Sequence, residues 1–286
     1  MEAPDRPIPP PVGLSPSAPA DPFATGTRPQ PVAANPIDNP PPSAPPPAMP
    51  THRVGGTPGA SAKGLGGLTA ALRTLFIIAV VVSAGAAVLV LSASSDAGRL
   101  ADGDKLSYTA RFDLADSIAN NSAIASGVAV LLSLPIFVLL VIWTYRAHRN
   151  LEAFGATNPR LPSGMAIGSW FIPLFFFLGP YWCISDAYRG AAPTSGRLGD
   201  LRSQAGSKVV LAWWLTFCIG HTLSWLNGSN GDLAIVLDAP EVVATTSAIS
   251  GVGYSILTVS AALGAVAVGT VGRRQDERRR AIGATG

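Results

Sequence analysis

The stretch "GSWFIPLFFFLGPYWCI", residues 168–184, decides the fold of this chain. It is apolar and aromatic enough to enter a lipid bilayer, yet it contains Pro173 and Pro180. Each proline removes a backbone hydrogen-bond donor and tends to break a helix. The segment therefore either crosses a membrane or enters it and turns back, and this choice sets the topology of the whole chain.

The composition predicts a membrane protein. Of the 286 residues, 48% are hydrophobic and only 13% are charged, whereas soluble domains carry about 25% charged residues. The formal net charge is +3, but the basic residues flank apolar segments, which is typical of membrane orientation and not of a nucleic-acid-binding surface. Cys183 and Cys218 provide neither a disulfide framework nor metal-ligand spacing. We expect no cofactor, no metal and no nucleic-acid partner.

Four further segments are long and apolar enough to span a bilayer, which requires about 20 apolar residues. They cover residues 74–93, 122–145, 209–228 and 244–271. The sequence therefore predicts an all-α fold, a polytopic membrane helical bundle of four spanning helices. Residues 168–184 are the fifth candidate.

The placement of Lys and Arg predicts the orientation, because positive residues accumulate in short cytoplasmic loops. Residues 94–121 and 229–243 are mainly acidic, so we expect both loops outside. Residues 146–164, 186–208 and the chain after 272 are rich in arginine, so we expect them in the cytoplasm.

This orientation requires that residues 168–184 do not cross. A crossing would place the basic loop 186–208 outside, the acidic loop 229–243 inside and the arginine-rich C-terminus outside. If the segment instead enters and returns, or lies along the inner leaflet, every loop obeys the rule. We therefore predict a Pro-broken re-entrant or interfacial segment, with both termini cytoplasmic and the chain in the plasma membrane.

The first 63 residues form a separate region. Nineteen of the 26 prolines lie in the first 58 residues, and such a tail has too few large apolar residues to bury a core. We predict a disordered Pro-rich cytoplasmic tail over 1–63, a helical membrane domain over 64–272 and a basic cytoplasmic tail over 273–286. The Pro-rich tail acts either as a solvated spacer or as a ligand for a proline-recognising protein partner.

The stretch from Trp143 to Tyr188 resembles a known family. "WTYRAHRNLEAFGA" and "GMAIGSWFIPLFFFLGPYWCISDAYRG" are similar to the actinobacterial membrane family named domain of unknown function 4328, over about residues 120–272. The family pattern is W-x-x-R-x-x-x-N followed by Trp-Phe-Ile-Pro and a later proline. The chain departs from the family in having "LFFF" where an Asn often follows that run. The resemblance implies a multi-pass membrane protein but no reaction, because the family has no established activity.

The residues of that pattern are the first candidates for a site. Trp143, Arg146 and Asn150 lie three or four residues apart, so we expect them on one face of a helix that leaves the bilayer. Trp143 is expected as an interfacial anchor, and Asn150 as a hydrogen-bond partner of the backbone freed at Pro173 and Pro180. Two alternatives remain for the arginines. Arg146 and Arg149 either serve only as positive-inside charges, or form a site with Trp170 for anionic lipid headgroups or another anionic ligand.

Two features of the later helices are also candidates. His221 is the one titratable side chain well inside a predicted span, where it either hydrogen-bonds another helix or relays protons. Ala261, Ala265 and Gly269 have the four-residue spacing of small residues that permits close helix packing. Such packing occurs within one chain or in a homo-oligomer.

The sequence carries no motif of a catalytic site, so we expect no enzyme. The leading hypothesis is a non-catalytic membrane scaffold or partner-binding subunit. The alternative is a small-solute or ion transporter or channel in which residues 168–184 line the path, because broken helices mark the binding sites of many transporters.

Overall fold

The computed structural model describes residues 62–103, 106–192, 200–225 and 232–283, all within one compact unit. Its elements are α1 (Gly66–Ala101), α2 (Tyr108–Ala153), α3 (Met165–Gly168), η1 (Phe175–Phe177), α4 (Gly179–Arg189), η2 (Leu201–Ser203), α5 (Lys208–Ser224), α6 (Leu233–Asp238) and α7 (Pro240–Gly283). Across the described ranges the secondary structure is helical, apart from an isolated β-bridge between Thr157 and Asp200. The all-α prediction is confirmed for these ranges, and the predicted Pro-rich tail lies outside them up to residue 61.

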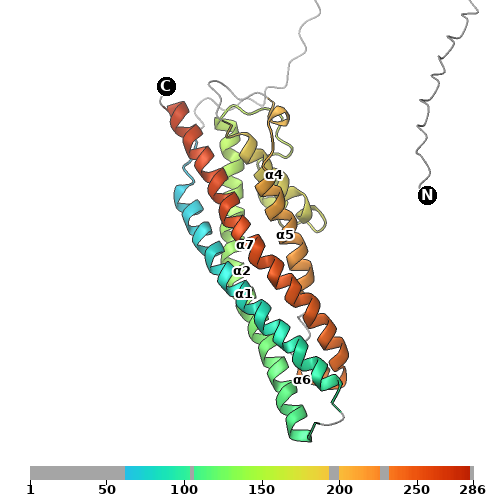
Figure 1. Cartoon of the computed structure of the whole chain (residues 1–286). Helices are drawn as coiled ribbons and strands as arrows, with labels where there is room; N and C mark the ends of the chain where they lie inside the picture. The colour runs from blue at the N-terminus through green and yellow to red at the C-terminus, as the bar shows by residue number, and fades with distance from the viewer. Residues whose placement is uncertain (1–61, 104–105, 193–199, 226–231, 284–286) are drawn as a thin grey trace, which may run out of the picture. The chain divides into compact units, whose positions relative to one another are not determined.

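Three long helices, α1, α2 and α7, run side by side (Figure 1). Glycines allow α1 and α7 to approach closely: a Cβ at Gly251 would lie 2.5 Å from the Leu91 side chain. A Cβ at Gly264 would lie 2.9 Å from the Phe76 ring. The two helices therefore pack in antiparallel order, with the start of α1 beside the end of α7.

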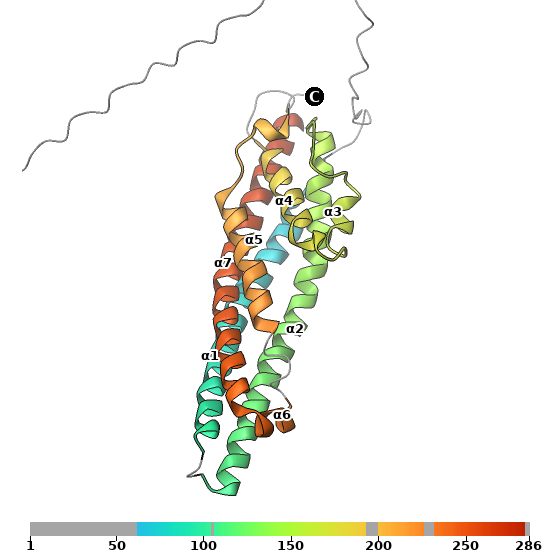
Figure 2. The same cartoon turned by 90° about the vertical axis from the view of Figure 1, so that its right-hand side faces the viewer.

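The shorter helix α5 packs against another face of α7. A Cβ at Gly220 would lie 2.8 Å from the Leu257 side chain, and a Cβ at Gly253 would lie 2.6 Å from the backbone nitrogen of Ser224. Figure 2 shows α4 beside the first half of α5, with α3 next to α2. This arrangement brings the segment around residues 165–189 against both α2 and α5.

Three helices in the described part of the chain, α1, α2 and α7, are long and apolar enough to cross a membrane. Helix α5 has 17 residues, so its length of about 25 Å is less than a hydrocarbon core of about 30 Å. Large apolar side chains are exposed along all four helices, as at Val81, Leu131, Leu215 and Val259. This surface is compatible with a membrane protein, and the structure supports three of the four predicted spans by length.

Helices extend further than the predicted spans. Most of the predicted external loop 94–121 is helical, because α1 continues to Ala101 and α2 begins at Tyr108. The predicted basic tail is also helical as far as Gly283. Its charges favour a helix, because Arg273 and Glu277 pair at 3.9 Å one turn apart.

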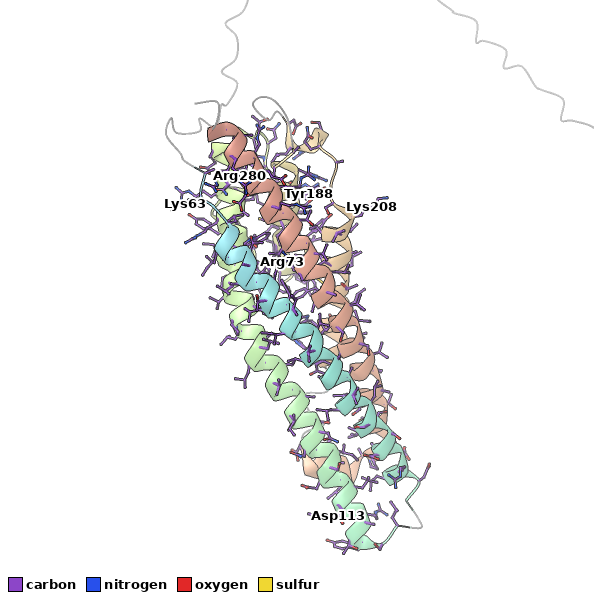
Figure 3. All side chains as sticks on the ribbon, turned by 60° about the vertical axis from the view of Figure 1, so that its left-hand side comes forward. Lys63, Arg73, Asp113, Tyr188, Lys208 and Arg280 are labelled. Carbon is purple, nitrogen blue, oxygen red and sulfur yellow. The ribbon has the colours of Figure 1, made fainter. Side chains whose placement is uncertain are left out.

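Charges of opposite sign gather at opposite ends of the bundle, as the labels Arg280 and Asp113 in Figure 3 illustrate. The first residues of α1, the end of α2 with the chain that follows it, the end of α4, η2, the start of α5 and the end of α7 form what we call the basic end. The other end of these helices, with α6, is the acidic end. Described residues of the acidic end include Asp96, Asp102, Asp113, Asp116, Asp232, Asp238 and Glu241. Those of the basic end include Lys63, Arg73, Arg146, Arg149, Arg160, Arg189, Arg202, Lys208, Arg273, Arg274, Arg278, Arg279 and Arg280. They outnumber the carboxylates of that end, which are Glu152, Asp186, Asp200, Asp276 and Glu277, and the described acidic residues of the other end outnumber Arg99 and Arg111.

Candidate functional site: the end of α2 and the broken segment

Residues 165–189, which we call the broken segment, reverse direction instead of forming one helix. The four-residue helix α3 is followed by a turn in which Phe175 N donates to Pro173 O at 2.7 Å. Leu174, at the centre of this turn, has φ 64° and ψ −44°, which is the strained γ-turn conformation. Pro173 therefore precedes a reversal, whereas Pro180 lies in the first turn of α4, where its missing N–H costs nothing.

The reversal is supported by packed aromatic rings. Trp170 is 4% exposed, and its ring centre lies 5.6 Å from that of Phe137 on α2 and 5.9 Å from that of Trp214 on α5. Phe176 continues the contacts, 6.0 Å from Trp170 and 6.2 Å from Phe217. The three pairs that Trp170 makes with Phe137, Phe176 and Trp214 are edge-to-face, and such pairs add about 0.5–1.5 kcal/mol each beyond area burial. The "FFF" run thus packs partly against the bundle.

The apex of the reversal is exposed and apolar. Leu174 is 83% exposed and Phe171 is 65% exposed. The indole nitrogen of Trp214 donates to Phe177 O at 2.7 Å, which satisfies one backbone carbonyl near the apex. An exposed apolar tip held against a bundle is compatible with contact to lipid.

A buried amide network lies at the level where α2, α4 and α7 meet the start of α1. Asn150 Nδ2 donates to Gln275 Oε1 at 3.0 Å and to Lys63 O at 2.9 Å, while Lys63 N donates to Asn150 Oδ1 at 2.9 Å. Gln275 Nε2 in turn donates to Ala147 O at 2.9 Å and to Ala187 O at 3.2 Å. The network ties together four segments that lie far apart in the sequence.

This geometry corrects the expectation for Asn150. Its side chain bonds Lys63 and Gln275, and Gln275 supplies the contact to the broken segment through Ala187. Gln275 was not a sequence candidate, although it is the one uncharged side chain in "RRQDERRR" and is 1% exposed. An uncharged residue within a charged run is the signal that could have indicated it.

Trp143 is a core residue and not an interfacial anchor. It is 0% exposed, and its indole nitrogen donates to Thr69 Oγ1 on α1 at 3.0 Å. The expectation failed because α1 and α7 cover this face of α2. Trp143 and Asn150 share the buried face, whereas Arg146 is exposed beside it.

The two arginines of α2 do not share a surface with Trp170. Arg146 and Arg149 are both exposed, and Arg149 Nη1 donates to Tyr145 OH at 2.7 Å. Trp170 is buried among aromatic rings. The Trp170 indole therefore cannot contact an anion that Arg146 and Arg149 bind at the surface.

Asp186 of α4 holds the connection that follows α2. Its Oδ2 accepts from Arg160 N at 2.8 Å, and Arg160 Nε and Arg189 Nη1 each lie 3.9 Å from its Oδ1. Burial raises the pKa of Asp186, and the Arg160 N–H and the charges of Arg160, Arg189 and Arg202 oppose this shift. A single buried carboxylate thus fixes α4 to the chain around Arg160.

His221 is bonded within its own helix. Its Nδ1 lies 3.0 Å from Phe217 O, and its ring centre lies 4.2 Å from that of Phe217.

The described residues contain no group of three or more His, Cys, Asp or Glu that could hold a metal ion. An apolar hollow of about 240 Å³ follows α5 along Cys218, Ile219 and Thr222, without converging polar groups.

The small residues of α7 pack within the chain. Ala261 is 6% exposed in the largest core cluster, and Gly269 faces the Arg73 side chain of α1, whose Cδ would lie 3.1 Å from an added Cβ. The four-residue spacing of small residues is therefore used for helix packing within one chain.

Comparison with known proteins supports the resemblance of the central block. The family model described as "Domain of unknown function (DUF4328)" matches residues 103–273, a range that starts earlier than the predicted 120–272. No curated protein and no solved structure matches the chain. Because the match covers more than half of the sequence, the chain belongs to the DUF4328 family of domains of unknown function.

Proposed function

We propose that the chain is a multi-pass plasma-membrane protein with four crossings, in which the basic end and both termini are cytoplasmic. α5 is the fourth crossing: it starts at the basic end, and α6 already lies at the acidic end, where Val236 packs with Leu100 and Ile118. In this topology Lys208, at the start of α5, and Val236 of α6 lie on opposite sides of the bilayer. The separation of charges between the two ends supports this orientation.

The depth of the broken segment supports re-entry and opposes a fifth crossing. Trp170 packs on Phe137, which precedes Arg146 by nine residues, or about 13 Å of helix. It also packs on Trp214, which follows Lys208 by six residues, or about 9 Å. Trp170 thus lies less than half of a bilayer of about 30 Å from the charged residues of the basic end, and α4 then returns to that end.

Within this topology, we propose the function of a non-catalytic scaffold or partner-binding subunit. One observation carries this choice: Trp170 and Phe176, the aromatic residues of the broken segment that face the bundle, pack against α2 and α5 and leave no space for a path between them. Trp170 contacts Phe137, Phe176 and Trp214. Broken backbone at membrane depth is tolerated where protein covers it, and no water-filled path is needed to explain it.

Cysteine labelling tests the topology. In a chain carrying Cys183→Ser and Cys218→Ser, single cysteines replace the exposed residues Ser203, Asp238 and Arg280. We expect a membrane-impermeant maleimide to label Asp238→Cys in intact cells, and to label the other two only after permeabilisation. Labelling of both Ser203→Cys and Arg280→Cys in intact cells, with Asp238→Cys protected, is the pattern expected if the broken segment crosses, and it would overturn the proposed topology.

Removal of the Pro-rich tail tests the scaffold role. The deletion should end at residue 61, because Lys63 is part of the Asn150 network. We expect the shortened chain to insert normally and to lose its cross-linked protein partners, with reconstituted vesicles showing no solute flux. Flux that Arg146→Ala abolishes in a correctly inserted protein would instead favour the transporter.

A further inference from the structure

Arg73 lies at the start of an uncharged stretch of α1, beside Gly269 of α7. We call the surface along the line where α1 and α7 pack together the groove. Arg73 is exposed, and no ion pair to it is found among the described residues. Its side chain crosses α7 over Gly269, where an added Cβ would lie 3.1 Å from Arg73 Cδ and Nε. Figure 3 shows Arg73 on this face, on the side of the basic end. Gly269 therefore provides the space that the arginine occupies.

Arg273 of α7 lies one turn beyond Gly269 on the same flank. Its side chain is 72% exposed and has a carboxylate, Glu277, at 3.9 Å. Side chains lean towards the N-terminus of their own helix. Because α1 and α7 are antiparallel, Arg73 leans towards the basic end and Arg273 leans away from it. The Cα–Cβ bonds of the two arginines therefore tilt towards each other along the axis of the bundle.

Each arginine ends a stripe of exposed apolar residues. On α1 the stripe below Arg73 contains Ile77 (58% exposed) and Val81 (71% exposed). On α7 the stripe below Arg273 contains Val259 and Val266, each 54% exposed. Two apolar stripes under two cations match the amphipathic shape of a phospholipid.

We propose that the groove between α1 and α7 binds an anionic phospholipid of the leaflet at the basic end. The phosphate lies between Arg73 and Arg273, and an acyl chain lies along the apolar stripes. Charge complementarity selects an anionic headgroup, because one carboxylate, Glu277, stands against two arginines in this groove. The inference rests on the proposed membrane location, and it adds a lipid site that does not involve Arg146, Arg149 or Trp170.

Native mass spectrometry of the full chain in detergent tests the site, with phosphatidylglycerol and phosphatidylcholine of identical acyl chains as probes. We expect Arg73→Gln and Arg273→Gln each to weaken phosphatidylglycerol binding about fivefold. The matched control is Arg111→Gln, an exposed arginine at the acidic end that should leave binding unchanged. Gly269→Ala keeps both charges but displaces Arg73, so it should also weaken binding.

Equal binding of the two lipids by the unmodified chain, or equal losses in Arg73→Gln and Arg111→Gln, would overturn the proposal. Competition by sn-glycerol 3-phosphate at the concentration of the lipid would show a site for free phosphate instead. A failure of the proposed topology is distinguishable, because it would appear in the labelling pattern while the lipid-binding differences persisted.

Discussion

Asn150 and Gln275 hydrogen-bond each other through their side-chain amides inside the basic end, with 3.0 Å between Asn150 Nδ2 and Gln275 Oε1. Both are buried, at 5% and 1% exposure. Their remaining amide groups bond backbone atoms of Lys63, Ala147 and Ala187. Both side-chain amides therefore have a hydrogen-bond partner for each oxygen and each nitrogen, and together they connect α2, α4 and α7 with the chain just before α1.

We predict that Gln275→Leu destabilises the bundle by about 2–3 kcal/mol, because it leaves Asn150 Nδ2 and two buried carbonyls with fewer partners. The double variant with Asn150→Leu should cost less than the sum of the single variants, by about 1–2 kcal/mol. Unfolding in mixed micelles measures both values. The matched control is Asn120→Leu on the exposed face of α2, which should change stability little. Additive effects of the two buried variants would show that Asn150 and Gln275 are not energetically coupled.

Close packing of α5 on α7 gives a second prediction. Gly253→Ala should destabilise the bundle by about 1–3 kcal/mol, because the new Cβ would lie 2.6 Å from Ser224 N and 2.9 Å from Leu223 C. Backbone atoms cannot move aside as a flexible side chain can. Gly127→Ala is the control, since nothing lies within 4 Å of its Cβ position; it should stabilise α2 by about 0.5–1 kcal/mol. Thermal unfolding in detergent compares the two, and an equal shift of both midpoints would refute the steric explanation.

The long helices were predictable, because uncharged apolar runs leave few alternatives to a helix. Their ends were not, since a hydropathy pattern stops at the first polar residues, whereas the helices continue through them: α1 includes Asp96 and Arg99, which pair at 3.2 Å. The break at Pro173 was likewise predictable from the loss of a donor. Its form was not, because a leucine at φ 64° is a state that no local preference favours.

The contacts of the site depended on pairs that are distant in the sequence. Asn150 and Gln275 are separated by 125 positions, and Trp143 and Thr69 by 74. The pattern W-x-x-R-x-x-x-N indicated that these residues share one side of α2, which holds for Trp143 and Asn150. This side of α2 is buried because α1 and α7 pack against it, and the sequence of α2 alone does not show which helices do so.

The strained turn supplies a third prediction. Leu174→Gly should stabilise the chain in detergent by about 1 kcal/mol, because glycine adopts positive φ without the strain that leucine incurs. Leu174 is 83% exposed, so little packing is lost. Leu178→Gly is the matched control: Leu178 is 51% exposed but has φ −115°, so glycine there should destabilise. Equal destabilisation by the two variants in thermal unfolding would show that the turn at Leu174 carries no strain.

The aromatic cluster supplies the last prediction. Trp170→Ala should destabilise the bundle by about 3–5 kcal/mol, because the indole fills the space between α2, α5 and the broken segment. Phe171→Ala removes the neighbouring ring, which is 65% exposed, and should cost less than about 1 kcal/mol in detergent. Protease protection of the chain around residues 158–189 provides a second measurement, because loss of Trp170 should release the broken segment before the long helices unfold. If Trp170→Ala left both the unfolding midpoint and this protection unchanged, the segment would be held by its backbone and by Asp186, and the aromatic rings would be dispensable.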